Sequence, residues 1–430
     1  MLAPSPISRT ALLQKFTAVR ELTEQICLPL QPEDTVVQPM VDVSPPKWHM
    51  AHTTWFFETF ILKEHLPGYK LFHKDYGYLF NSYYNSIGNR VLRHNRGTLT
   101  RPPLAEVLAY RVHVNESMAR FLETADDGKL EKLLPVLELG MQHEQQHQEL
   151  LVTDIKYILS TNPLLPAYLP EEAYSIPNES YAVPDSTYLE IPGGIYHIGY
   201  KGKNFCFDNE LAEHKVYLDD CRIQNRLVTN KEYLEFIEDG GYSDFRFWLD
   251  EGWALVKQNQ WEAPLYWIKQ DAAWHRFTLH GLQPLNLNAP VTHISFYEAN
   301  AFASWAQKRL LTEFEWEAAT QLFQPEAATE NFLDDFVLDP LPLPGQISAT
   351  TCHQLLGSTW EWTYSAYHPY PGFKKAEGAI GEYNGKFMIN QMVLRGGSCA
   401  TPLNHIRTTY RNFFHPDKRW QFTGIRLADK

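Results

Sequence analysis

Positive charge is scarce in this 430-residue sequence, because 38 Lys and Arg residues stand against 51 Asp and Glu residues, a formal net charge of −13. A chain without a basic excess has no electrostatic footprint for nucleic-acid phosphates or anionic lipid. Long apolar stretches are also missing, since no run approaches the ~18 residues that a membrane-crossing helix needs. We therefore expect no nucleic-acid or membrane partner, and chemistry on a small molecule.

Cysteine is sparse as well. The five cysteines are scattered along the chain, and no two have Cys-x-x-Cys spacing, so neither a zinc knot nor a disulfide framework is predicted. The segment 1–13 lacks the charged-then-apolar order of a secretory signal. These features predict a cytoplasmic protein. They leave the oligomeric state open.

The length predicts two domains, since single cores rarely grow far beyond ~250 residues. In the first, residues 8–162, apolar residues recur at helical spacing in four long segments. We expect these helices near residues 10–28, 45–60, 104–124 and 130–158. Ser44 is the expected N-cap of the second helix, with Pro45 at its first position. Four such helices predict a bundle.

Residues 163–185 contain repeated prolines among polar residues, a composition typical of an extended connector. Beyond it, residues 186–430 show short apolar stretches punctuated by glycine, near 189–200, 216–223 and 393–398. Helical segments are expected near 230–238 and 295–307. This pattern predicts an α+β domain.

The candidate for chemistry is a group of histidines. His143 and His147 lie four residues apart inside the fourth helix, on one face, so both rings can reach one metal ion. The alternative is a pair of solvated histidines on a polar face. A third ligand is available from the second helix at His52, whose aromatic neighbours indicate burial; His49, one turn earlier, is the alternative ligand or a supporting partner.

Three neutral imidazoles leave three positions open around a six-coordinate metal ion. Zinc also accepts three histidines, but a site for two organic ligands and dioxygen suits redox-active iron(II). The residues alone leave the choice of metal open.

Both halves of the chain resemble one known family, the sulfoxide synthases of ergothioneine biosynthesis. The first half, with His52 and the run HEQQHQE at 143–149, resembles their DinB-like domain. The second half resembles their formylglycine-generating-enzyme-like domain, which is C-type-lectin-like. Its motifs are IPGG at 191–194, VTNKEY at 228–233, RLLTEFEWE at 309–317, GSTWEWT at 357–363 and LRGGS at 394–398.

The resemblance implies the metal and the reaction. It gives the iron(II) ligand roles to His52, His143 and His147, and leaves His49 a structural role. It implies that dioxygen is used to join C2 of hercynine, which is N-α-trimethylhistidine, to a thiol sulfur, with a sulfoxide as product. One open iron position each for imidazole, thiolate and oxygen matches this need.

The resemblance also implies substrate-binding residues. Gln146 and Asn412 match positions that orient hercynine. Phe413 and Phe414 offer ring faces to its trimethylammonium group, which binds through cation–π and apolar contacts. Ordinary core packing is the alternative for the two phenylalanines.

The sulfur donor differs between subfamilies. Those that use γ-glutamylcysteine carry an acidic residue shortly after the matching asparagine, where this sequence has Phe414, which favours free cysteine. Arg90 and Arg419 are the candidates for pairing with the donor carboxylate, because a guanidinium binds a carboxylate bidentately. A plain surface position is the alternative for either arginine.

A phenol is expected as proton donor to reduced oxygen. Tyr83 and Tyr84 resemble the tyrosine pair of the cysteine-using subtype, with Tyr383 in reserve. Simple packing at a loop edge is the alternative.

Three other functions are alternatives to this one. The bundle fits a zinc-dependent thiol transferase, with the second domain as a lectin-like binding module. A formylglycine-generating enzyme needs a close pair of reactive cysteines late in the chain, and residues 407–414 contain none. A sister activity on unmethylated histidine often comes with an added methyltransferase domain, for which 430 residues leave no room.

Overall fold

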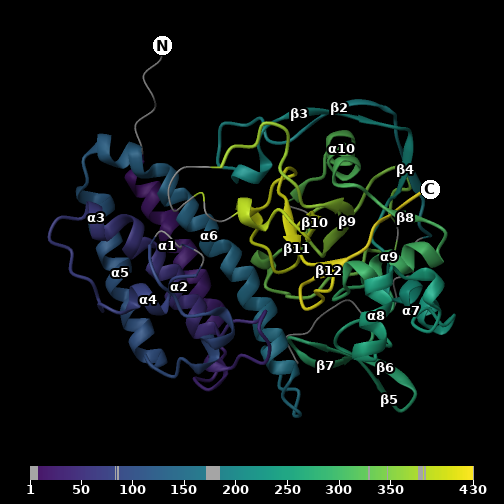
Figure 1. Cartoon of the computed structure of the whole chain (residues 1–430), viewed down its shortest axis with the longest axis horizontal. Coiled ribbons are helices and arrows are strands. Elements are labelled where there is room, and N and C mark those ends of the chain that lie inside the picture. The colour runs from purple at the N-terminus through teal and green to yellow at the C-terminus, as the bar shows by residue number, and fades with distance from the viewer. Residues whose placement is uncertain are drawn as a thin grey trace. The chain divides into compact units, whose positions relative to one another are not determined.

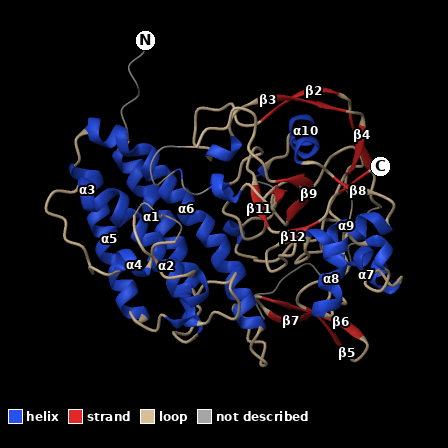
Figure 2. Cartoon of the chain, in the orientation of Figure 1, coloured by secondary structure: helices blue, strands red, loops and turns tan. Residues whose placement is uncertain are grey.

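Figure 1 shows the chain as a computed structural model that describes residues 8–82, 84, 87–170, 185–327, 330–345, 347–375, 381 and 384–429. The chain divides into two compact units, the first made of Met1–Asn162 with Glu377–Glu382 and the second of Pro163–Ala376 with Tyr383–Lys430. Figure 2 shows that the strands of the described residues lie in the second unit. Among the described helices, none is both long and apolar enough to cross a membrane.

The first unit is the predicted helical bundle. Its four long helices are α1 (Arg9–Cys27), α2 (Pro46–Phe57), α5 (Leu104–Thr124) and α6 (Asp127–Ser160). Shorter elements are a 3-10 turn (Asp34–Val36), a π-helical turn (Glu58–Leu62), α3 (Lys63–His65), α4 (Tyr76–Leu79) and a second 3-10 turn (Arg93–Thr98). The long helices match the four predicted segments within a few residues at each end.

The start of α2 differs from the prediction. The helix begins at Pro46, the preceding Pro45 has extended backbone, and no side chain caps the helix. Ser44 is not the cap: its hydroxyl accepts a hydrogen bond from Arg96 at 2.9 Å, and its N–H donates to Asp154 at 2.8 Å. Proline at the first helical position has no N–H that needs a cap, so the serine is available for these long-range contacts.

Helix α2 is the centre of the bundle, because every residue from Pro46 to Phe57 is buried. It packs against α5 and α6, and α1 packs against the same two helices. At Gly140 of α6, an added Cβ would lie 2.7 Å from the ring of Phe57 and 2.8 Å from that of Phe56. The absent side chain therefore allows α6 to approach α2 closely, one turn before His143.

A buried charge cluster joins all four helices. Glu144 of α6 forms ion pairs with Arg20 of α1 at 2.7 Å and with Arg111 of α5 at 3.2 Å. Thr23 donates to Glu144 at 2.8 Å, and Arg20 also donates to Thr54 of α2 at 2.7 Å. Burial by itself would raise the pKa of Glu144, but the two guanidinium groups outweigh it and hold the pKa below its ordinary value.

The second unit is the predicted α+β domain. Its described helices are α7 (Asn230–Glu238), α8 (Asp250–Asn259), α9 (Phe296–Trp305) and α10 (Glu313–Phe323), with 3-10 turns at Asp208–Glu210, Phe245–Phe247, Leu333–Asp335, Asn384–Phe387 and Leu403–His405. The sequence predicted α7 and α9 but not α8 and α10.

The described strands of the second unit form four small sheets. The sheet orders are β1-β4-β13-β8, β11-β10-β9-β12, β2-β3 and β5-β6-β7. The strand bounds are β1 Tyr188–Ile191, β2 Gly194–Ile198, β3 His214–Leu218, β4 Cys221–Gln224, β5 Trp267–Gln270, β6 Ala273–Thr278, β7 Gly281–Pro284, β8 Arg309–Leu310, β9 Trp360–Ala366, β10 Met392–Arg395, β11 Asn412–Phe414, β12 Thr423–Gly424 and β13 Leu427–Ala428. Strand β11, at the edge of its sheet, pairs antiparallel with β10, with Asn412 opposite Leu394.

Two sequence motifs of the second unit prove to be helix starts. In RLVTNKE (226–232) and RLLTEFE (309–315), the threonine caps α7 and α10, and the glutamate three residues later bonds back to the threonine N–H. Each glutamate also pairs with the arginine of its motif, Glu232 at 2.9 Å and Glu315 at 2.7 Å. Such capping boxes stabilise helix starts, so these motifs are scaffold.

The predicted connector is described only in part. Residues 163–170 belong to the second unit, where the N–H groups of Tyr168 and Leu169 donate to the carbonyl of Leu279 at 2.8 and 2.9 Å. Residues 171–184 lie outside the described residues. We keep 8–162 for the bundle and 186–430 for the second domain as proposed boundaries.

Replacing Arg20 with methionine should lower the free energy of unfolding by about 3 kcal/mol or more, because removing one member of a buried ion pair leaves the other uncompensated. Urea unfolding followed by circular dichroism measures the change. Arg9→Met is the control: the Arg9–Asp127 pair is partly exposed, so its loss should cost about 1 kcal/mol or less. Equal effects would show that the buried cluster does not stabilise the bundle.

Candidate metal centre

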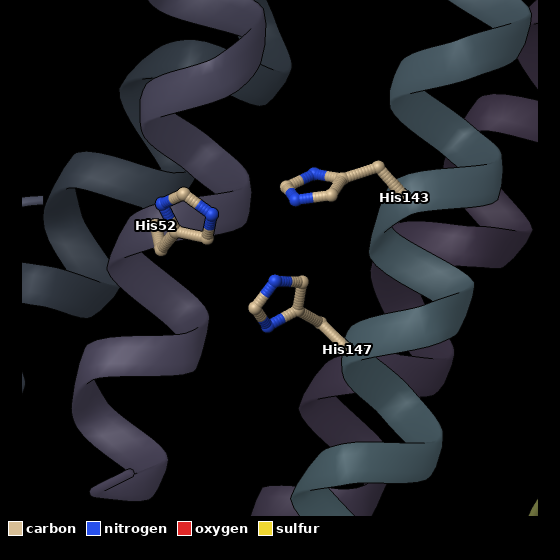
Figure 3. A group of neighbouring side chains, drawn as sticks. All are labelled: His52, His143 and His147. Carbon is tan, nitrogen blue, oxygen red and sulfur yellow. The ribbon is translucent and has the colours of Figure 1, made fainter. Parts of the chain in front are cut away.

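Three histidines converge inside the bundle. Figure 3 shows His52 of α2 facing His143 and His147 of α6. One potential ligand atom from each lies within 4.8 Å of the other two. The ring centroids are 5.0 Å apart for His52 and His143, 4.8 Å for His52 and His147, and 4.7 Å for His143 and His147. The structure thus brings together the three residues that the sequence analysis predicts as metal ligands.

The ring of His52 is held in one orientation. It stacks between Trp48, at 4.6 Å and 13°, and Trp55, at 5.6 Å and 15°. Its Nδ1 lies 2.6 Å from the carbonyl oxygen of Phe80. A carbonyl only accepts hydrogen bonds, so Nδ1 carries the hydrogen, and Nε2 keeps the lone pair that a metal ion requires.

His49 does not belong to the cluster of potential ligands. Its ring lies instead between two other side chains, with Nδ1 2.8 Å from Nδ1 of His147 and Nε2 3.0 Å from Asp154. His49 is therefore a partner of His147 and not a competing ligand in this arrangement.

The donor set fits a metal ion. Within the described part of the chain, Nδ1 of His143 is buried and has no hydrogen-bond partner. A buried polar atom of this kind is costly and often marks the place of an ion or water. Three imidazole nitrogens suit zinc, copper, nickel or iron better than the hard cations magnesium and calcium.

The three imidazoles are neutral at pH 7. Burial lowers the pKa of His143 to about 4. Burial, together with repulsion from His143, lowers the pKa values of His52 and His147 well below the ordinary value. A neutral imidazole is the form that binds metal ions, so the three side chains are already in the protonation state that a metal ion requires.

Of the predicted proton donors, Tyr84 lies in the surroundings of the histidines. It is buried, and its ring centroid is 5.6 Å from that of Trp55, which stacks on His52. Phe60 contacts the same phenol ring at 5.2 Å. Tyr83 and Tyr383 lie outside the described residues. The proton-donor role stays a prediction.

The other predicted residues of the first unit are Gln146 and Arg90. Gln146 is half-buried on α6, directly before His147. Arg90 is half-buried in the loop between α4 and the following 3-10 turn. Their substrate-binding roles remain predictions.

Asn412, Phe413 and Phe414 form strand β11 of the second unit and are all half-buried. Phe413 stacks on Tyr367 at 4.2 Å and 11°, and Phe387 lies 5.8 Å from it. The side-chain oxygen of Asn412 accepts from the N–H of Phe413 at 2.9 Å. An aromatic stack with a partly accessible ring is compatible with cation–π binding of a quaternary ammonium group.

Arg419 is engaged within the second unit. Its guanidinium lies 3.2 Å from the buried carboxylate of Glu298 and 4.2 Å from the ring centre of Trp261, and it donates to the carbonyl of Ala263. A substrate carboxylate would have to compete with Glu298 for this arginine. The donor-binding role remains a prediction for both Arg90 and Arg419.

The sequence named His49 as a possible supporting partner of the histidines, but Asp154 and the Phe80 carbonyl were missed. Asp154 follows His147 by seven residues, two helical turns, and lies in a buried segment of α6. A charged residue on the histidine face of a buried helix was a usable signal. The Phe80 carbonyl, by contrast, could not be found from the sequence because any residue type supplies one.

Comparison with known proteins defines the class. Residues 15–151 match the DinB superfamily, and residues 176–333 and 339–430 match the sulfatase-modifying factor enzyme 1-like domain. The chain is thus a DinB-type helical domain joined to a domain of the formylglycine-generating-enzyme type.

Individual relatives identify the family. A hercynine oxygenase of Mycolicibacterium smegmatis is 31% identical over 414 residues, 90% of this chain and 91% of that protein. One from Mycobacterium tuberculosis is 34% identical over 68% of this chain and 71% of its own length. Ergothioneine biosynthesis protein 1 of Schizosaccharomyces pombe is 28% identical over 52% of this chain and 27% of that protein. The chain belongs to the hercynine oxygenase family of ergothioneine biosynthesis and is an oxygenase, which confirms the resemblance of its motifs.

The metal-free protein should lose stability as the pH falls from about 6.5 toward 4. Histidine in the unfolded chain takes up a proton near pH 6.5, whereas folded His143 stays neutral down to about pH 4. Within that window the unfolded state binds more protons, so unfolding becomes easier by about 1.4 kcal/mol per pH unit for such a histidine.

Urea unfolding of chelator-treated protein at pH 7 and pH 5 measures this dependence. His143→Gln should lose less stability between the two pH values than the wild type does. His94 is exposed, so His94→Gln should behave like the wild type. An unchanged dependence in His143→Gln would contradict a buried, neutral His143.

Proposed function

We propose that this oxygenase joins the sulfur of cysteine to C2 of hercynine in a reaction that uses dioxygen and iron(II), with hercynylcysteine S-oxide as product. The observation that carries the proposal is the convergence of His52, His143 and His147 in a chain of the hercynine oxygenase family. The names of the relatives support hercynine and oxygen as substrates.

In this proposal His52, His143 and His147 hold the iron(II). Their neutral nitrogens and the unsatisfied Nδ1 of His143 support a bound transition metal. When bound, iron(II) would supply the redox chemistry with dioxygen and the open coordination positions that the reaction requires. Zinc lacks this redox chemistry.

The stoichiometry assigns every atom. Hercynine gives up the hydrogen on C2, cysteine gives up the thiol hydrogen, and a C–S bond forms. Dioxygen is the oxidant: one of its atoms enters the sulfoxide, and the other leaves as water together with the two hydrogens. The chain must therefore bind two organic substrates, orient C2 toward sulfur and deliver protons to oxygen.

The chain's own residues provide these functions in our proposal. Gln146 and Asn412 orient hercynine, and Phe413 and Phe414 contact its trimethylammonium group through their rings. Either Tyr83 or Tyr84 holds the proton for reduced oxygen, since a phenol gives up a proton without being ionised beforehand. The burial of Tyr84 next to Trp55 supports a proton store shielded from water.

Cysteine is the proposed sulfur donor, with Arg90 or Arg419 pairing with its carboxylate. Phe414 provides no charge for the amine of a γ-glutamyl group, which is why γ-glutamylcysteine is the alternative and not the first choice. A zinc-dependent thiol transfer remains a second candidate, because three histidines also suit zinc. That reaction would consume no dioxygen.

Anaerobic reconstitution with iron(II), followed by air, hercynine and cysteine, should yield hercynylcysteine S-oxide, detected by mass spectrometry. His52→Ala should reduce the product by at least about a hundredfold, because it removes one of three ligands. His94→Ala, at an exposed histidine, is the matched control and should retain activity. Absence of product in the wild type, with zinc retained instead of iron, would favour the transferase.

Phe414→Asp should raise the use of γ-glutamylcysteine relative to cysteine by about tenfold, because one new charge pair with the glutamyl amine is worth on the order of 1.4 kcal/mol. Ratios of kcat/KM for the two donors measure the change. Phe245→Asp introduces the same charge at an exposed site and should leave the ratio unaltered. An unchanged ratio in Phe414→Asp would reject this placement of the donor pocket.

A further inference from the structure

His49 and Asp154 form a hydrogen-bonded chain that ends on a proposed metal ligand. Nε2 of His49 lies 3.0 Å from Oδ2 of Asp154, and Nδ1 of His49 lies 2.8 Å from Nδ1 of His147. His49 and Asp154 are each only 2% exposed. Water therefore competes little for these contacts, and the three side chains determine where the hydrogens lie.

The positions of the hydrogens in this series of hydrogen bonds follow from the acceptor at its end, Asp154. Asp154 Oδ2 also accepts the N–H of Ser44 at 2.8 Å, so this oxygen accepts hydrogen bonds and Nε2 of His49 donates to it. A neutral His49 then has its lone pair on Nδ1, and the short contact with His147 requires that Nδ1 of His147 donate. The remaining nitrogen of His147, Nε2, keeps the lone pair that a metal ion needs.

We propose that His49 and Asp154 are positioning residues for the metal centre: together they hold His147 in the tautomer and ring orientation that bind the ion. The inference rests on the metal site of the proposed function. Carboxylate and imidazole partners of this kind raise the basicity of a ligand, and their loss typically weakens metal binding 10–100-fold.

A second proposed ligand, His52, is supported by a backbone group. The Phe80 carbonyl performs the same service for His52, with a contact of 2.6 Å to Nδ1. A backbone carbonyl cannot be removed by substitution, whereas His49 can. The His49–Asp154 relay, the hydrogen-bonded series formed by these two side chains, is therefore the support of this centre that mutagenesis can test directly.

Asp154 also has a structural role, because its contact with Ser44 ties the segment before α2 to α6. A test must separate positioning from packing. His49→Asn places a side-chain oxygen near the position of Nδ1, where it can still accept from His147. His49→Leu fills a similar volume without an acceptor, and His49→Gln keeps a polar group toward Asp154 but none at the Nδ1 position.

The experiment measures anaerobic iron(II) affinity by competition with a chromogenic chelator. Relative to the wild type, His49→Leu and His49→Gln should bind iron(II) about 10–100-fold more weakly, and His49→Asn should recover most of the loss. His405→Leu is the matched control, because His405 is another buried histidine, bonded to Tyr410 in the second unit. Its affinity should equal that of the wild type.

A second readout is the visible spectrum of the cobalt(II)-loaded protein, which reports the ligand field independently of turnover. The spectrum of His49→Asn should match the wild type, and that of His49→Gln should differ. Thermal unfolding of the metal-free variants identifies any that fail to fold; if His49→Leu fails, the comparison of His49→Asn with His49→Gln carries the test.

The outcomes are distinct. Wild-type protein that binds neither iron(II) nor cobalt(II) would overturn the metal site itself, and the relay with it. Tight binding by the wild type together with unchanged affinity in His49→Gln would overturn the relay alone. Equal weakening in His49→Asn and His49→Gln would assign His49 to packing, and would also overturn the relay.

Discussion

The close packing of α6 against α2 is the constraint on which the candidate centre depends, because the three histidines are divided between these helices. Gly140 permits the approach, and one turn later Glu144 is fixed by ion pairs to α1 and α5. A slip of α6 by one residue would rotate its side chains by about 100°. His143 and His147 would then turn away from His52. Packing and buried charge thus set the geometry before any metal binds.

The histidines are also prepared chemically. Burial keeps them neutral, and the hydrogens of two rings are directed away from the centre, toward the Phe80 carbonyl and toward His49. A flexible or protonated imidazole would have to be reoriented or deprotonated during binding, which costs affinity. In the folded bundle the rings are already oriented and neutral, so metal binding does not require these changes. The buried charge cluster of Arg20, Arg111 and Glu144 adds rigidity to the bundle, since each of its members is paired.

The second unit serves a different purpose. Its recurring motifs cap helices and pair arginines with glutamates, as at Glu232 and Glu315. On this scaffold the edge strand β11 presents Asn412, Phe413 and Phe414, each half-buried. Rigid small sheets hold such side chains more precisely than a free loop would. The fold therefore separates residues that maintain structure from a short edge strand whose side chains are partly exposed.

The sequence by itself determined the four helices of the bundle, the α+β texture of the second half and the histidine spacing, because helical periodicity and motif residues are local properties. Helices α8 and α10 were not predicted, although α10 has a local signal in the capping box of Thr312 and Glu315. The sequence named His49 as a possible supporting partner, but it did not determine the start of α2 at Pro46 or the contact of His49 with Asp154. Those features depend on contacts between residues far apart in the chain, such as Ser44 with Asp154 and His49 with Asp154. Only the tertiary structure decides which of several buried polar groups meet, because hydrogen bonding inside a protein is settled by packing.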